Sequence, residues 1–408
     1  MRPALVFALL FFIACTGDDP ALGDGTQQPD GGSSGQTPSN DAGGQTPTDA
    51  GQDSGLVCTA PLADCKGAGV CDTNLSNDPK HCGACNHDCG IGAACLDSAC
   101  QPVVLAKNLT SVASVAVNAT ALVILADGGP YVCPKDGCGG STGISLISQE
   151  RYPVAPHTTF IDGTNAYWLG TQAANGVQWE LRKCALTGCG LAPTTIDDGQ
   201  LGNEMRGEGG SILRYDPTGG VTRIYTDGVT PKAYLDKLTI SESLHFAVAG
   251  GKVAFSNTDS GTGTNKGTWG GAFMNVVPSH LMNNGNWVAI AGDDVFASRS
   301  VDATYDAIYR CSFSGCGGVG SLFGNTGATT GTGKISDLTA DASGVYWVES
   351  IGATGRVMRC SLPDCAGGPK AMAVLQEKPF AITTDDKFVY WVNAGANVTS
   401  GSVNRVAK

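Results

Sequence analysis

The chain has 408 residues, of which 58 are glycine and only 15% are charged, and its formal net charge is −12. Long amphipathic helical stretches are absent, so an all-β fold is expected. Seven aspartates lie in residues 16–57, which contain no lysine or arginine, so the rest of the chain is only weakly acidic. This charge argues against binding to nucleic acid and against electrostatic docking on anionic lipid.

The N-terminus has the features of an export signal. Arg2 is followed by a mostly apolar run, 4–14, which is too short to span a bilayer because a spanning helix needs about 20 residues. The run ends in Phe12-Ile13-Ala14-Cys15, which resembles the bacterial lipobox. The resemblance implies that 1–14 is a lipoprotein signal peptide and that Cys15 is lipidated. The alternative is an ordinary cleaved signal with an incidental cysteine.

Residues 15–57 are predicted to be the lipidated cysteine and a disordered tether. The segment after Cys15 is rich in Gly, Asp, Thr, Gln, Ser and Pro and has no aromatic residue. Such a segment buries too little apolar surface to offset the entropy lost on ordering.

The other 16 of the 17 cysteines fall into even groups, which favours disulfides in an oxidising, extracytoplasmic compartment. Eight lie within 58–101. The other eight form four C-x4-C pairs, Cys133 and Cys138, Cys184 and Cys189, Cys311 and Cys316, and Cys360 and Cys365. A four-residue spacing suits a hairpin whose ends meet at disulfide distance. Soft-metal binding is the alternative for these pairs.

The segment 58–101 is predicted to be a small disulfide-rich module. Its centre, 77–89, reads NDPKHCGACNHDC and resembles a cysteine-rich element found in surface and secreted proteins of myxobacteria and similar bacteria. The resemblance implies a secreted or surface-exposed setting, and it implies no catalytic or binding function. His81 and His87 beside these cysteines could instead form a zinc site. The pairing of the eight cysteines stays open at this stage.

From residue 102 onward the chain repeats a strand–turn–strand pattern. The clearest copies are 160–168, 339–347 and 382–391, and in each an aspartate precedes a Tyr-Trp pair. The three aspartates are Asp162, Asp341 and Asp385, each six residues before the tryptophan. A lone turn aspartate usually caps its own backbone, with calcium binding as the alternative. The Tyr-Trp pairs are predicted to pack in the core between strands of the blades. The alternative is that they stack on a sugar ligand.

Four strands every 40 to 50 residues are typical of a β-propeller, which we expect over 102–408. Seven blades are favoured, with a degenerate blade over 212–240. Six blades and a long insertion are the rival. The last blade lacks a fourth strand, and 103–106 is expected to supply it and to leave no long free edge. The repeat resembles YWTD-type and TolB-like propellers, which are usually six-bladed, and the resemblance implies no ligand residues.

No catalytic, cofactor-binding or metal-binding residue is assigned from the sequence. A G-x-S-x-G match at 31–35 lies in the tether, where no strand–turn–helix can form. The stretch 257–286 departs from the repeat and is expected to interrupt a blade. Because loops and insertions on propellers often carry function, its bulky side chains are the candidate binding residues; the alternative is a solvent-exposed elaboration whose aromatic side chains fold back on the ring. They are Trp269, Phe273, Met274 and His280.

These patterns favour a lipid-anchored, monomeric, extracytoplasmic protein on the outer membrane or cell surface that presents its propeller to a protein or glycan. Membrane contact is expected through the lipid alone. The first alternative is an exported glycan lyase or hydrolase, which needs an acid, a base and a cation on one face. The residues considered for it are Glu204, Arg206, Glu208, Asp259, His280 and Arg299. The other alternative is a passive envelope component.

Overall fold

The computed structural model describes residues 57–408 except for short gaps. The gaps are 127–128, 139–143, 150–157, 172–178, 198–203, 217–219, 228, 231–232, 236–243, 258–266, 273–278, 283–285, 302–304, 317–319, 326–332 and 353. The predicted signal peptide, Cys15 and nearly all of the predicted tether lie outside the described residues. Among the described residues, the chain forms no helix of the length and apolarity that crossing a membrane requires.

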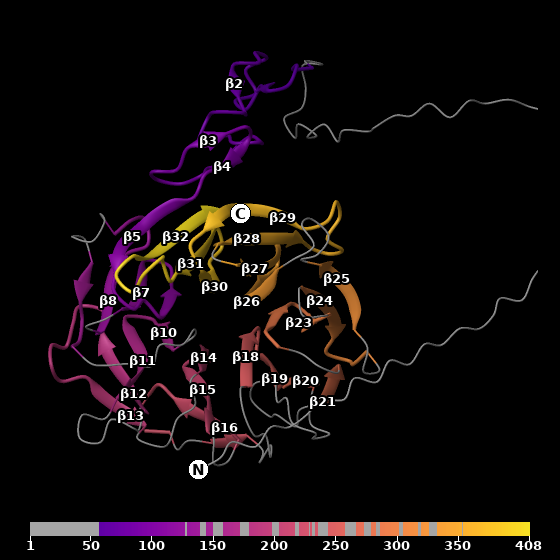
Figure 1. Ribbon diagram of the computed structural model, residues 1–408. Coiled ribbons are helices and arrows are strands. Elements are labelled where there is room, and N and C mark those ends of the chain that lie inside the picture. Colours follow the sequence, from indigo (N-terminus) through magenta and orange to yellow (C-terminus); the bar gives the residue numbers. More distant parts are fainter. Residues whose placement is uncertain are drawn as a thin grey trace, which may run out of the picture. The chain divides into compact units, whose positions relative to one another are not determined.

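The described part of 102–408 forms seven four-stranded antiparallel sheets, which we number as blades 1 to 7 in chain order (Figure 1). Blade 1 is β6–β9 (Ser114–Val117, Ala121–Ala126, Gly129–Pro134, Ser145–Leu146), and blade 2 is β10–β13 (Thr159–Asp162, Asn165–Thr171, Trp179–Ala185, Thr194–Asp197). Blade 3 is β14–β17 (Met205–Glu208, Ser211–Asp216, Gly220–Tyr225, Ala233–Leu235), and blade 4 is β18–β21 (Leu244–Ala249, Lys252–Asn257, Gly267–Ala272, Ser279–Met282). Blades 5 to 7 are β22–β25 (Val288–Ala291, Asp294–Ser300, Asp306–Ser312, Ser321–Asn325), β26–β29 (Lys334–Asp341, Gly344–Ile351, Thr354–Ser361, Lys370–Gln376) and β30–β32 (Pro379–Thr384, Phe388–Asn393, Gly401–Ala407) with β5 (Val103–Leu109).

The first strand of each blade contacts the first strand of the next, and β30 of blade 7 contacts β6 of blade 1. The sheets therefore form a closed ring with these strands around its axis, and the predicted propeller is confirmed. The degenerate blade expected over 212–240 is blade 3. The seven sheets of the described residues match the favoured count of seven and not the rival count of six.

The ring closes through strands from both ends of the propeller. β5 pairs antiparallel with β32, with Ala106 opposite Val403 and Val104 opposite Asn404. The expectation that 103–106 completes the last blade is confirmed. This pairing also gives β32 hydrogen-bond partners on both edges.

The Tyr-Trp pairs form the packing between blades. Successive residues of a strand point to opposite faces of its sheet. In blade 2, Trp168 packs with Val123 and Cys184, whereas Tyr167 packs with Ile212 of blade 3. The tryptophan therefore faces the preceding blade and the tyrosine the following one. All three pairs are at most 1% exposed, which leaves no face for stacking on sugar.

The stretch 257–286 does not interrupt a blade, contrary to expectation. It contains β20 and β21, which are the third and fourth strands of blade 4. The sequence misled because this half of blade 4 has no C-x4-C pair, the feature that marks the end of the third strand in blades 1, 2, 5 and 6.

The disulfide-rich module consists of two short hairpins, β1–β2 (Leu62–Ala63, Thr73–Asn74) and β3–β4 (Cys95–Leu96, Ala99–Cys100). Its disulfides are Cys58–Cys71, Cys65–Cys85, Cys82–Cys95 and Cys89–Cys100. Each C-x4-C pair also forms a disulfide, at the end of the third strand of its blade. Eight disulfides indicate an extracytoplasmic protein.

Candidate functional site

One position in the innermost strands differs in character around the ring. We call it the entry position, because it lies where the innermost strand of each blade begins. In the second strand, we call the position that Trp168 holds in blade 2 the tryptophan position. The entry residue pairs with the residue that directly follows the tryptophan position. From blade 1 to blade 7 it holds Ser114, Thr158, Glu204, His245, Trp287, Asp337 and Ala381. Small or neutral residues fill it in blades 7, 1 and 2, and larger polar or aromatic residues fill it in blades 3 to 6.

Glu204, Arg206 and His245 form a contiguous cluster across blades 3 and 4. Nδ1 of His245 donates to Oε2 of Glu204 at 2.8 Å. Nε of Arg206 lies 3.4 Å from Oε1 of the same carboxylate. The side chains of Arg206 and His245 are 23% and 20% exposed, whereas that of Glu204 is 7% exposed, so the carboxylate lies beneath the two basic groups.

Trp287 extends this cluster into blade 5. Its ring lies over the imidazole of His245, with the two centroids 3.7 Å apart and the planes tilted by 30°. Sequence reasoning missed both His245 and Trp287 because each is an isolated residue along the chain. The usable signal was their place directly before, or at the start of, the first strand of a blade.

Asp337 holds the entry position of blade 6 and is fully buried. Its carboxylate accepts hydrogen bonds from the amides of Leu338 at 2.8 Å and Ile382 at 2.7 Å. It therefore joins blade 6 to blade 7. Burial lowers the pKa of Arg206, and the negative charges of Glu204 and Asp337 oppose that effect.

A cavity of about 300 Å³ lies on the ring axis, lined by the innermost strands of all seven blades. Its wall is mostly small and apolar, as at Ala247, Ala289 and Ala340, with threonines in blades 2, 6 and 7. Arg206 is the one charged residue among those that line it. The cluster therefore borders a cavity at the lower end of the size range of ligand sites.

This arrangement combines a cation, an oriented imidazole, a carboxylate and an aromatic face. With Nδ1 of His245 donating to Glu204, Nε2 is the basic nitrogen of the neutral ring. The guanidinium of Arg206 can recognise a carboxylate or a pair of hydroxyl groups. The cluster can bind an anionic or hydroxylated ligand, and it also has the parts of an acid–base site.

The structure brings together two of the six residues considered for an enzyme, Glu204 and Arg206. The carboxylate of Glu208, at the other end of β14, accepts hydrogen bonds from the amides of Gly250 and Gly251 at 2.7 and 2.9 Å, which is a turn-capping role. The guanidinium of Arg299 lies over the ring of Tyr309, 5.5 Å from its centroid. Asp259 lies outside the described residues, and so does the side chain of His280.

Two of the four candidate binding residues of 257–286 belong to described strands, the third and fourth of blade 4. Trp269 of β20 is opposite His280 of β21 in the register, so both belong to one pair of strands. Their side chains are not among those that the structure describes. Phe273 and Met274 lie outside the described residues altogether.

The turn aspartates join backbone and neighbouring blades. Asp341 accepts from the amide of Ser343 at 2.7 Å, and Asp385 accepts from the amides two and three residues further on, both at 2.8 Å. Asp162 accepts from the hydroxyl of Thr226 in blade 3 at 2.9 Å. These contacts match the capping interpretation of Asp341 and Asp385, and Asp162 links two blades.

The sulfurs of Cys82, Cys89 and Cys100 lie close together in the module. All three belong to disulfides, Cys82–Cys95 and Cys89–Cys100, so none is a thiolate that could bind a soft metal. Nδ1 of His81 accepts a hydrogen bond from the amide of Asn86 at 3.0 Å. In the described module this geometry fits disulfide packing and does not fit the zinc alternative.

No protein-family model and no curated protein matches this chain. Solved structures do resemble it in fold. YCF48 bound to a D1 peptide is 11% identical, with 76% of this chain and 96% of that chain covered and a TM-score of 0.50. The β-propeller domain of the Trilobed protease from Pyrococcus furiosus is 10% identical (73% and 95% covered, TM-score 0.46), and BamB from Moraxella catarrhalis is 10% identical (72% and 82% covered, TM-score 0.42). At these identities the likeness concerns the β-propeller fold alone.

Proposed function

We propose that this protein is a lipid-anchored, extracytoplasmic binding or scaffolding protein whose propeller receives a protein or glycan partner where the innermost strands of blades 3 to 5 begin. The observation that carries the proposal is the cluster of Glu204, Arg206, His245 and Trp287 beside the axial cavity. The predicted lipid on Cys15 and the tether 15–57 would hold the propeller away from the membrane surface.

Folding alone gives little reason for this cluster. At the same position, blades 7 and 1 use Ala381 and Ser114 and complete the same four-stranded sheet. Removing a carboxylate and a guanidinium from water costs free energy that their mutual attraction often only offsets. Charged groups kept half-buried at one end of a cavity therefore support a ligand site.

The geometry favours a partner that carries a carboxylate or several hydroxyl groups. Arg206 lines the cavity and suits a carboxylate, while the stacked rings of Trp287 and His245 offer a flat, partly polar surface. A peptide with an acidic group and an acidic glycan both meet this description. A second surface on Trp269, Phe273, Met274 and His280 stays a proposal from the sequence.

The test uses the full chain without its lipid, applied to an envelope extract and to a glycan panel. We expect a partner that the native protein retains and the Arg206→Met variant loses at least tenfold, since a charge-assisted hydrogen bond contributes roughly 1.5–3 kcal/mol. Arg299→Met is the matched control, because Arg299 contacts Tyr309 and does not line the cavity. A partner kept by Arg206→Met and lost by Trp269→Ala would move the site to the outer half of blade 4. Absence of any partner would favour the passive alternative.

The convergence of an acid, a base and a cation supports an exported glycan lyase or hydrolase as the second candidate. His245 oriented by Glu204 could act as a general base through Nε2, with Arg206 stabilising developing negative charge. Turnover of any glycan by the native protein that falls at least a hundredfold in His245→Gln would support it, since general acid–base catalysis contributes about 10²–10⁴-fold. Binding without turnover would leave the binding function alone.

A further inference from the structure

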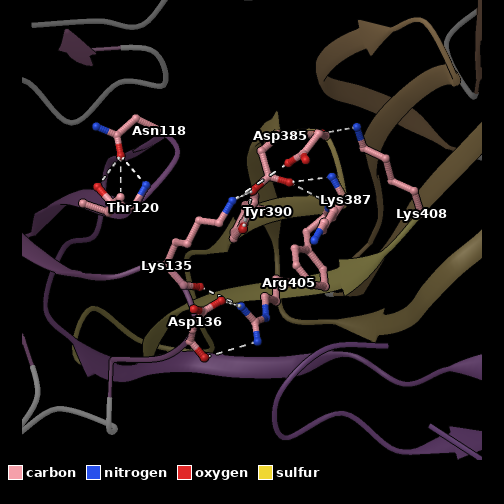
Figure 2. A network of polar contacts seen from close by, with 12 residues as sticks. Asn118, Thr120, Lys135, Asp136, Asp385, Lys387, Tyr390, Arg405 and Lys408 are labelled. Atoms are coloured by element: carbon pink, nitrogen blue, oxygen red, sulfur yellow. Dashed lines mark hydrogen bonds and ion pairs between the residues drawn. The ribbon is translucent and has the colours of Figure 1, made fainter. Parts of the chain in front are cut away.

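Arg405 of β32 is 1% exposed and contacts two parts of the chain outside its own blade; Figure 2 labels Lys135 and Asp136, which belong to one of them. Its guanidinium donates to the carbonyl oxygen of Lys135 at 2.7 Å and to that of Asp136 at 3.2 Å, both in the turn closed by Cys133–Cys138 of blade 1. It also donates to the carbonyl oxygen of Ile91 in the disulfide-rich module at 3.0 Å. One buried cation of blade 7 therefore binds both the first blade and the module.

Other contacts place the module against the same surface of blade 7. The guanidinium of Arg405 lies 4.6 Å from the centroid of the Phe388 ring, and that ring faces Gly90 of the module. A Cβ atom on Gly90 would lie 2.6 Å from Cζ of Phe388. Nε2 of His87 lies 2.8 Å from the backbone oxygen of Lys408. The module disulfides Cys82–Cys95 and Cys89–Cys100 belong to the same apolar cluster as Phe388 and Leu105 of β5.

The equivalent basic residues in other blades show what is particular to Arg405. Lys183, Arg310 and Arg405 each pair with the tyrosine-position residue of the second strand. Lys183 and Arg310 donate to a carbonyl oxygen in the turn of the next blade, Thr226 at 3.3 Å and Pro363 at 2.7 Å. Arg405 makes that contact to blade 1 and adds the one to the module. Its side chain is 1% exposed and that of Arg310 is 33% exposed.

We infer that this surface of blades 7 and 1, centred on Phe388 and Arg405, is a docking surface for the module, and that module docking and ring closure form one cooperative unit. Only Gln101 and Pro102 separate the module hairpin β3–β4 from β5, the strand that closes the ring. Displacing the module would remove one acceptor of a buried guanidinium and pull on β5 at once. Leaving such a group underbonded costs about 1–3 kcal/mol, so loosening either half destabilises the other.

Two glycines of the module allow a matched test in the full chain. Gly90 and Gly92 both have positive φ, +85° and +80°, so alanine strains the backbone similarly at either site. A Cβ on Gly92 meets only Cγ1 of Val103, at 3.7 Å, which is ordinary contact. Gly90→Ala must displace the buried Phe388 ring, whereas Gly92→Ala need not.

The measurement is amide hydrogen exchange. We expect Gly90→Ala to speed exchange in both Val103–Leu109 and Gly401–Ala407 by about tenfold or more relative to Gly92→Ala, because exchange follows the local opening equilibrium. Unchanged exchange in these two strands would overturn the inference. As a second variant, Arg405→Lys is expected to speed exchange in the module and in β5 together, whereas Arg310→Lys should affect neither. Faster exchange in the module alone after Arg405→Lys would also overturn it.

Discussion

Two regions of this propeller solve the same packing problem with different residues. Around blade 7, the Tyr-Trp pairs are fully buried, and polar side chains such as Lys135 and Asp385 contact one another in a network of polar contacts (Figure 2). In blades 3 and 4, the tryptophan position holds Arg214 and Phe255, and the entry position holds Glu204 and His245. We infer from this comparison that blades 6, 7 and 1 stabilise the ring, whereas the fold does not depend on the charges of Glu204, Arg206 and His245 in blades 3 and 4.

The largest expected effect is loss of an aromatic core residue in blade 7. Trp391 is fully buried, and its Nε1 donates to Gln376 at 3.0 Å. Trp391→Ala should lower the free energy of unfolding by about 3–5 kcal/mol, because it removes a large buried surface and leaves a cavity. Chemical denaturation measures this change. A loss below about 1 kcal/mol would mean that blade 7 repacks freely, against the proposed stabilising role.

The next effect concerns the ion pair that replaces aromatic packing in blade 3. Arg214 occupies the tryptophan position, and its guanidinium lies 2.6 Å from the carboxylate of Asp197 in blade 2, with both side chains buried. Arg214→Ala should lower the free energy of unfolding by roughly 3 kcal/mol, since it removes the ion-pair partner of a buried carboxylate. The double variant Arg214→Met/Asp197→Leu should recover much of that loss. If the double variant recovers none of the lost free energy of unfolding, apolar packing cannot replace the ion pair at this position.

A smaller effect is expected from the disulfide beside the closure. Replacing Cys133 and Cys138 by serine opens a short loop, which should lower the free energy of unfolding by about 2 kcal/mol in the chain-entropy picture. The same change at Cys311 and Cys316 is the control in blade 5. The first pair should cost more than the second, because its loop supplies the acceptors of Arg405. Equal losses would contradict that link.

Acid should weaken the contact that Asp385 of blade 7 makes with Lys135 of blade 1. Burial opposes ionisation of Asp385, but hydrogen bonds from Lys135, from two backbone amides and from Tyr390 outweigh it and lower the pKa of this carboxyl. A lowered pKa in the folded state contributes stability above the unfolded value of about 4, and that stability is lost as the pH falls through the folded pKa.

Melting temperatures of the native protein and of Asp385→Asn, measured from pH 6 to pH 2, test this prediction. The variant should be less stable at pH 6 and should lose less stability on acidification. Asp386→Asn is the neighbouring control, since its side chain is 75% exposed and lies 3.9 Å from Lys135. Parallel acid profiles for all three proteins would contradict the account.

Much of the fold could be predicted because five of the seven blades carry a local signal. The spacing from aspartate to tryptophan fixes two strands and a turn in blades 2, 6 and 7, and the C-x4-C pairs mark the end of the third strand in blades 1, 2, 5 and 6. The outer half of blade 4 was not predicted because it has no C-x4-C pair. The cluster could not be predicted from local pattern, since Glu204 and His245 are 41 residues apart and meet only because each lies close to the start of the first strand of its blade.

The most direct measurement concerns the claim that this cluster serves a ligand and not the fold. The triple variant Glu204→Gln/Arg206→Met/His245→Phe keeps the approximate volumes and removes the charges. We predict a melting temperature within about 3 °C of the native value or above it, because replacing half-buried charges by apolar groups is often neutral or stabilising. A fall of roughly 6 °C or more would show that the ring depends on these charges, and would contradict the account.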